Sequence, residues 1–199
     1  MKTKFIAAAL ALSSFAIFWS PAVAEDDAFS KGAAAYQQEE YADAATWFRI
    51  AAKQGNVNAQ IMLGGMYFQG KGVLEDDAEA VKWYRLAAEQ GHVDAQFILG
   101  YRYARGNGVP ENDTEAVKWY RMAAEQGSAA AQFNLGSMYR NGQGVPQDFI
   151  ECYKWYNLAA AQGSELAIGG KKVMRELMTS AQIAEAQKLS AAWKPVGER

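Results

Sequence analysis

The stretch AEAVKWYRLAAEQG at residues 78–91 returns almost unchanged as TEAVKWYRMAAEQG at residues 114–127. The two copies are 36 residues apart, and the same period recurs along most of the chain. A fixed period of about 20–50 residues is typical of stacked repeats, in which one unit cannot bury its apolar face alone. The repetition therefore predicts a solenoid in which successive copies share one continuous core.

Five columns of identical residues carry the repeat. They are Trp47, Trp83, Trp119 and Trp155; Gly55, Gly91, Gly127 and Gly163; Gly64, Gly100 and Gly136; Gly72, Gly108 and Gly144; and Ala59-Gln60, Ala95-Gln96 and Ala131-Gln132. Residues that recur in every copy are expected to occupy the same packing position in every layer of the stack. We therefore expect the tryptophan column in the core, and any specific function where the copies differ.

Each unit is predicted to form two helices. In residues 95–103, side chains four apart share one helical face, which is typical of a first helix. Glycines and Pro110 then end that helix. The second helix is predicted to start near Asp113 and to close at Gly127, a C-cap glycine. The expected N-caps of the second helices are Asp77, Asp113 and Asp148.

The pattern resembles the Sel-1-like repeat (SLR), a relative of the tetratricopeptide repeat. The resemblance rests on Ala-Gln-x-x-Leu-Gly-x-x-Tyr at 95–103, Gly-x-Gly-Val at 106–109 and Ala-Val-Lys-Trp-Tyr-Arg-x-Ala-Ala-Glu-Gln-Gly at 116–127. It implies an all-α fold, a right-handed α-solenoid of about five antiparallel helix pairs. Within one domain, residues 25–199, we expect repeats at about 28–55, 56–91, 92–127 and 128–163, and a C-terminal capping pair at 164–193.

The resemblance also implies a class of function, namely a scaffold or adaptor that binds a protein partner through a concave groove lined by the first helices. Exported SLR proteins include regulators of envelope sensors, partners of cell-wall enzymes and factors in host interaction, so the partner stays open. The groove residues that the resemblance selects are Ile61, Phe68, Gln69, Phe97, Tyr101, Arg105, Phe133, Ser137, Arg140 and Asn141. Aromatic and arginine side chains often anchor interfaces, although Phe97 and Phe133 could equally belong to the shared core.

Two other functions remain open from the sequence. One is a cell-envelope enzyme of the β-lactamase or peptidoglycan-acting type, an activity attached to SLR proteins with paired cysteines in each repeat. The other is a purely structural subunit of an envelope complex. The chain has one cysteine, Cys152, and one histidine, His92, in different repeats. This favours neither a nucleophile–base pair nor a metal site, so we expect no enzyme activity, catalytic residue, metal or cofactor.

These two single residues have simpler roles to fill. Cys152 stands in a column of alanines on the second helix, so we expect a buried, free thiol. His92 follows Gly91, where the other copies have asparagine or serine, so we expect it at the start of a helix.

The N-terminus has the features of a secretory signal peptide. Two lysines precede the apolar residues 5–19, and an Ala-Val-Ala motif ends at Ala24. We expect a signal peptide at residues 1–24, a periplasmic or secreted protein, and no stable membrane insertion after cleavage. The net charge of −2 gives no indication of a basic, nucleic-acid-binding surface, so we expect no nucleic-acid partner. We also expect a monomer.

Overall fold

The computed structural model describes residues 21–197, so the expected signal peptide at 1–24 lies largely outside the described residues. The described part forms ten α-helices and no strand. These are α1 (Pro21–Gln37), α2 (Tyr41–Lys53), α3 (Val57–Gln69), α4 (Asp77–Glu89), α5 (Val93–Arg105), α6 (Asp113–Glu125), α7 (Ala129–Asn141), α8 (Phe149–Ala161), α9 (Glu165–Leu177) and α10 (Ser180–Ala192).

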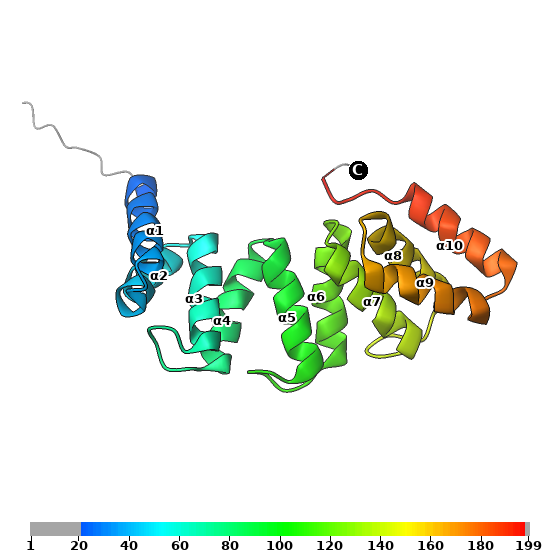
Figure 1. Ribbon diagram of the computed structural model, residues 1–199, viewed down its shortest axis with the longest axis horizontal. Helices are drawn as coiled ribbons and strands as arrows, with labels where there is room; N and C mark the ends of the chain where they lie inside the picture. Colours follow the sequence, from blue (N-terminus) through cyan, green and yellow to red (C-terminus); the bar gives the residue numbers. More distant parts are fainter. Residues whose placement is uncertain (1–20, 198–199) are drawn as a thin grey trace, which may run out of the picture.

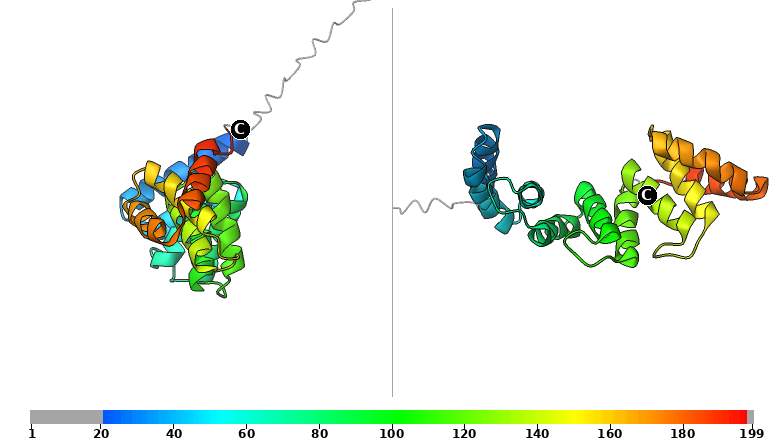
Figure 2. Two further views of the ribbon diagram at one scale, coloured as in Figure 1. Left: turned by 90° about the vertical axis from the view of Figure 1, so that its right-hand side faces the viewer. Right: turned by 60° about the horizontal axis from the view of Figure 1, so that its bottom comes forward.

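The helices form a row of stacked pairs (Figure 1). Helices α1 and α2, α3 and α4, α5 and α6, and α7 and α8 pack on each other, and each second helix also contacts the first helix of the next pair. Figure 2 shows that the row is curved rather than straight. The expectation of an all-α solenoid built from helix pairs is confirmed.

The contact inside each pair joins a glycine of the first helix to an aromatic ring of the second. A Cβ atom added to Gly100 would lie 2.7 Å from the ring of Tyr120, and one added to Gly64 would lie 2.9 Å from the ring of Tyr84. Both rings are buried. The glycine column therefore exists because any side chain there would overlap the ring that holds the pair together.

The tryptophan column is only partly in the core. Trp119 and Trp155 are buried, as expected, whereas Trp47 and Trp83 are half-buried. One residue further along a helix points about 100° away, so the aromatic residue after each tryptophan takes the central place instead. Trp155 owes part of its burial to the C-terminal segment, because the ring of Trp193 packs edge-on against it with centroids 6.3 Å apart.

The N-caps of two second helices lie one residue earlier than expected. The three caps are Asp76, Asn112 and Asp148. The Asp76 carboxylate, for example, accepts hydrogen bonds from two backbone N–H groups of the first turn at 2.9 Å. The expectation is confirmed for Asp148 and wrong for Asp77 and Asp113, which are the first residues of α4 and α6. Their side chains are thereby available for contacts with the next unit.

Buried glutamines form a hydrogen-bonded ladder between units. Gln132, which is fully buried, donates from Nε2 to the carbonyl of Ala124 at 3.2 Å and accepts from Nε2 of Gln162 at 2.9 Å. Gln60 and Gln96 repeat both bonds in the preceding units. The Ala-Gln column and the glutamine before each C-terminal glycine therefore recur because they are partners.

The C-terminal helices depart from the pattern. The Leu-Gly pair that contacts the second helix in other units is replaced by Lys171-Lys172, and α10 packs against α8 rather than against its sequence neighbour α9. Two lysines cannot form the apolar contact that a second helix needs. The chain then turns back toward the middle of the stack, where the N–H of Val196 donates to the carbonyl of Glu125 at 2.8 Å (Figure 1).

Candidate binding site between the first helices

Two pockets occupy equivalent places one unit apart on the side of the stack formed by the first helices. We call them the α3–α5 pocket and the α5–α7 pocket, and their volumes are about 310 and 320 Å³. The α3–α5 pocket is lined by Phe68, Tyr84, Phe97, Ile98, Tyr101, Arg102 and Asn107. The α5–α7 pocket is lined by Tyr101, Ala104, Arg105, Asp113, Tyr120, Asn134, Ser137, Met138 and Gln143.

A tyrosine of the second helix contributes to each pocket. Tyr84 lines the α3–α5 pocket and Tyr120 lines the α5–α7 pocket. Burial raises the pKa of both phenols above the ordinary value of 10.0, so both hydroxyls are neutral and able to donate a hydrogen bond at physiological pH. The same rings pack on the glycines of the first helices, which fixes them in place.

One cause of the different charge of the two pockets is a residue pair that changes between the units. In the α3–α5 pocket, Arg102 is 4% exposed and its Nη1 lies 2.7 Å from Oδ1 of Asp77. One unit later, Met138 replaces the arginine while Asp113 keeps the acid. As a result Asp113 lines its pocket, whereas Asp77 does not line the other one. In the described part of the chain the Asp113 carboxylate has no ion pair and no hydrogen bond.

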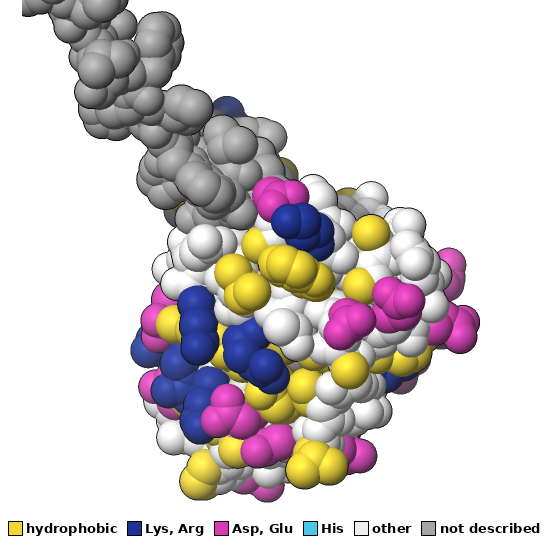
Figure 3. Space-filling view, turned by 90° about the vertical axis from the view of Figure 1, so that its left-hand side faces the viewer, with side chains coloured by type: hydrophobic (Ala, Val, Ile, Leu, Met, Phe, Trp, Pro, Cys, Tyr) yellow, Lys and Arg dark blue, Asp and Glu magenta, His cyan; other side chains and the backbone are white. Residues whose placement is uncertain are grey.

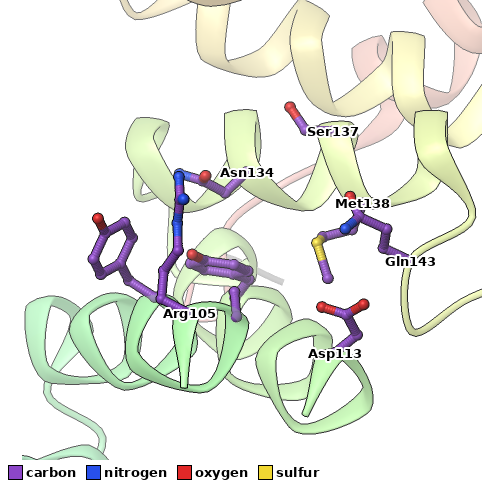
Figure 4. Close-up of a pocket in the computed structure, with 9 residues that line it drawn as sticks. Arg105, Asp113, Asn134, Ser137, Met138 and Gln143 are labelled. Carbon is purple, nitrogen blue, oxygen red and sulfur yellow. The ribbon is translucent and has the colours of Figure 1, made fainter. Parts of the chain in front are cut away.

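Figure 4 shows how the polar groups of the α5–α7 pocket are arranged. The Arg105 side chain extends from α5 toward Asn134 of α7, and Asp113 lies on the opposite side of the pocket beside Met138 and Gln143. Among the described residues Arg105 has no carboxylate partner; its guanidinium lies near the ring of Tyr101, 5.7 Å from the centroid. The pocket thus presents a cationic wall and an anionic wall that do not neutralise each other by direct contact.

Five of the ten residues expected in the groove line these pockets. They are Phe68, Phe97, Tyr101, Arg105 and Ser137. Phe68 is 44% exposed and Tyr101 is 43% exposed, so both aromatic side chains are open to a partner. Ser137 is bonded within the protein, because its hydroxyl lies 2.9 Å from the hydroxyl of Tyr156. Its hydroxyl is therefore committed to the fold as well as facing the pocket.

The other five expected groove residues line neither pocket. Ile61 and Phe133 pack against the core as partly buried side chains, and Phe133 stacks on the ring of Tyr156 at 5.3 Å. Arg140 donates from Nε to the side chain of Asn141 at 3.2 Å. The fifth residue, Gln69, is exposed at the end of α3. Phe97 combines both roles, because it lines the α3–α5 pocket and its ring lies 5.9 Å from that of Tyr120.

Sequence reasoning misses the polar half of the α5–α7 pocket. It assigns Asp113 to a helix cap and does not single out Asn134, Met138 or Gln143. The available signal is a change within a column, since Arg102 becomes Met138 while the facing acid is retained.

Helix α9 continues the same face with aliphatic side chains that the sequence analysis also leaves out. Leu166, Val173 and Leu177 stand 36 residues after Ala130, Ser137 and Asn141 of α7, the last two of which are expected groove residues. They are 70%, 46% and 57% exposed. Because exposed aliphatic side chains contribute nothing to the core, this row extends the surface that could meet a partner.

Residues 21–197 can also be compared with the requirements of a metal site and of a membrane-spanning helix. Within that range no group of three His, Cys, Asp or Glu side chains could hold a metal ion, and none of the described helices is long and apolar enough to cross a membrane. His92 is an N-cap, as expected, and accepts from the N–H of Ala95 at 3.5 Å. Cys152 is buried and free, also as expected, and burial raises the pKa of its thiol to about 12.

Charges at the N-terminal end of the stack are mixed. Figure 3 shows lysine and arginine side chains gathered on one side of this end, with acidic side chains beside and around them. A surface of both signs does not form the continuous basic stripe that nucleic-acid backbones require.

Comparison with known proteins identifies relatives of this architecture. A family model described as Sel1 repeat matches residues 28–56, 57–92, 93–128 and 129–164. The chain is similar to a solved Sel1 repeat protein from Oxalobacter formigenes, with 41% identity, a TM-score of 0.59, and coverage of 63% of this chain and 94% of that chain. It is also similar to c5321, a protective antigen of uropathogenic Escherichia coli strains that displays an SLR fold, with 28% identity, a TM-score of 0.57, and coverage of 83% of this chain and 44% of that chain. No curated protein gives a significant match.

Proposed function

Because the chain belongs to the Sel1 repeat family, whose members generally act as protein–protein interaction scaffolds, we propose that it is an exported adaptor. It binds a protein partner through the concave face formed by its first helices, and it has no enzyme activity of its own. The observation that carries this proposal is the combination of exposed Phe68 and Tyr101 with Arg105 on one face. A guanidinium and large aromatic side chains are the groups that most often anchor protein interfaces.

A partner segment of mixed character suits this face. Aromatic and aliphatic side chains can pack on Phe68, Tyr101 and the exposed row of α9, and a carboxylate can pair with Arg105. The segment is therefore expected to carry apolar residues and at least one acidic residue, in an extended or helical form.

Crosslinking in the native envelope, followed by purification of the captured protein, identifies the partner for a quantitative test. Replacing Tyr101 and Arg105 together by alanine should weaken binding by about a hundredfold, since each anchor contributes about 2 kcal/mol at an interface centre. Helicity and melting temperature should change little, because Tyr101 and Arg105 are exposed.

The matched control is a pair of charged residues on α4, a second helix. Lys82→Ala with Glu89→Ala removes two exposed side chains and should leave the affinity nearly unchanged. If the control pair abolishes binding while the first pair does not, the partner uses the opposite face and the site proposed here is wrong.

Export requires its own measurement. Mass spectrometry of the protein purified from its native source should find Glu25 as the first residue, because the proposed cleavage follows Ala24. A soluble cytoplasmic protein that retains Met1 would contradict the proposed export and leave the binding face untouched.

A further inference from the structure

We propose that the α5–α7 pocket receives an arginine side chain of the protein partner, with its guanidinium paired to Asp113. This inference rests on the proposed function and names the chemistry by which one unit of the stack recognises its ligand. Its basis is a carboxylate that has lost the charged partner present in the preceding unit.

Four equivalent residue pairs follow the 36-residue period, each joining the start of a second helix to the next first helix. They are Tyr41 with Met66, Asp77 with Arg102, Asp113 with Met138, and Phe149 with Met174. The first and last pairs are apolar and the second is an ion pair. Only the third pair sets a carboxylate against an apolar side chain.

The second pair shows what a carboxylate at this position binds. Arg102 brings its Nη1 to 2.7 Å from Asp77 Oδ1, and its guanidinium carbon lies 4.0 Å above the centroid of the Phe68 ring. The side chain is almost fully buried between the units. A guanidinium held by an acid on one side and a ring on the other is thus an arrangement that this scaffold already supports.

One unit later the arginine and the aromatic ring are both missing, and only the acid remains. Met138 stands where the arginine was, and Ala104 stands where the Phe68 ring was. The acid remains and lines a pocket of about 320 Å³ together with Tyr120 and Gln143. Because a carboxylate in the first turn of a helix is already favoured by the helix dipole, its charge alone indicates no ligand. The accessible pocket, in which no guanidinium faces the carboxylate as Arg102 faces Asp77, is what indicates one.

Arg105 does not supply the missing cation. Its side chain points across the mouth of the pocket toward Asn134, away from Asp113 (Figure 4). It would repel a lone guanidinium, but it would attract a carboxylate located next to the arginine in the partner. An arginine with an acidic neighbour therefore suits both walls, and it agrees with the acidic character inferred for the partner segment.

Guanidinium is preferred over ammonium for two reasons. Its planar donors can contact the Asp113 carboxylate and the Gln143 side-chain oxygen together, and it is less strongly hydrated than an ammonium, so it loses less when it enters a half-enclosed pocket. Lysine offers a compact charge that gains less from these two acceptors.

The direct test uses N-acetyl-arginine amide as the probe and follows the amide signals of the ¹⁵N-labelled protein. Saturable shifts are expected at Asp113 and Gln143. N-acetyl-citrulline amide has nearly the same shape without the charge and should bind about tenfold more weakly, since a hydrogen bond between two charged groups is stronger than one to a neutral donor. Asp113→Asn should lower affinity for the arginine probe by a similar factor, and Arg105→Ala should raise it.

Asp94→Asn is the matched control, because it removes an exposed carboxylate of α5 that lines neither pocket. It should bind the arginine probe as the unaltered protein does. The reverse experiment fills the pocket from within: Met138→Arg with Ala104→Phe copies the neighbouring unit and should abolish probe binding. Asp113→Asn keeps the proposal testable if that double variant fails to fold.

The proposal is overturned if the probe gives no saturable shifts at its solubility limit, or if the arginine and citrulline probes bind equally. It is also overturned if Asp113→Asn and Asp94→Asn behave alike. None of these results affects the proposed function, which stands or falls on the Tyr101 and Arg105 double variant and the purified partner.

Discussion

Buried polar side chains decide the register between units at the scale of single residues. The Gln132 side chain is fully buried and satisfies both a backbone carbonyl and the Gln162 amide. A leucine there would keep the volume but remove both hydrogen bonds, and each such bond contributes about 0.5–1.5 kcal/mol.

Gln132→Leu is therefore expected to lower the free energy of unfolding by about 2 kcal/mol, measured by urea denaturation. Gln69→Leu makes the same change at an exposed position and should stay within about 0.5 kcal/mol of the original protein. Equal stability of the two variants would show that the ladder contributes nothing.

The sequence predicts which residue types recur, but not always which of two neighbours is central. The tryptophans and the aromatic residues after them repeat equally well, and only packing shows that Tyr84 lies in the core while Trp83 is half-buried. Asp113 is harder still. A single sequence assigns it to a cap, because the residue that leaves it without a partner, Met138, lies on another helix.

Helices in this stack are joined by loops that pack tightly against the previous unit. Gly144 has a φ of +68°, and a Cβ atom there would overlap the backbone carbonyl of Asp113. Gly127 has a φ of +98° but nothing within 4 Å of the place where a Cβ would lie. A side chain at Gly127 would therefore cause backbone strain alone, whereas a side chain at Gly144 would cause backbone strain and a steric clash with α6.

Gly127→Ala is expected to cost about 1–2 kcal/mol of unfolding free energy, the strain of a left-handed residue with a side chain. Gly144→Ala should cost clearly more, because the loop must also move away from α6. Thermal unfolding of the two variants compares them directly. A smaller loss at Gly144 would mean that the loop shifts freely and does not hold the units together.

The sequence predicts the helices along the whole described stack, but it does not predict how the last helix packs. Two helices after residue 163 are correctly expected, and the loss of the Leu-Gly pair is visible in the sequence. The packing of α10 on α8 could not be predicted, because the local sequence of a helix does not determine which surface that helix will cover.

The ionisation of buried groups makes the stability of the whole stack depend on pH. Burial raises the pKa of Cys152 from 9.0 to about 12, and it raises the pKa values of Tyr84, Tyr120 and Tyr156 above 10.0. All four groups are neutral when protonated, so the folded state holds their protons more tightly than the unfolded chain does. Their contribution to stability is complete below pH 9 and is lost as the pH rises above 9 toward 12.

The melting temperature should therefore be nearly constant from pH 7 to 9 and fall steadily above pH 9. Cys152→Ala places in this helix the residue that the other units have at the same position, and it should delay the onset of the fall to about pH 10, where tyrosines begin to ionise in the unfolded chain. A variant that falls from pH 9 like the original would assign the effect to other groups.

The glutamine ladder has a consequence for the history of the chain. Each bond of the ladder joins side chains 30 residues apart, from the end of one second helix to the start of the first helix before it. An inserted copy of one complete 36-residue unit would bring both halves of this bond with it, and its buried glutamine would reach a carbonyl of the preceding unit as Gln132 reaches that of Ala124. A tandem duplication would thus produce a longer protein in which the new boundary between units is already hydrogen-bonded. After the loss of one whole unit, the two units brought together would form the same hydrogen bond. The number of units can therefore change by recombination between copies, while each new copy is then free to acquire a pocket of its own.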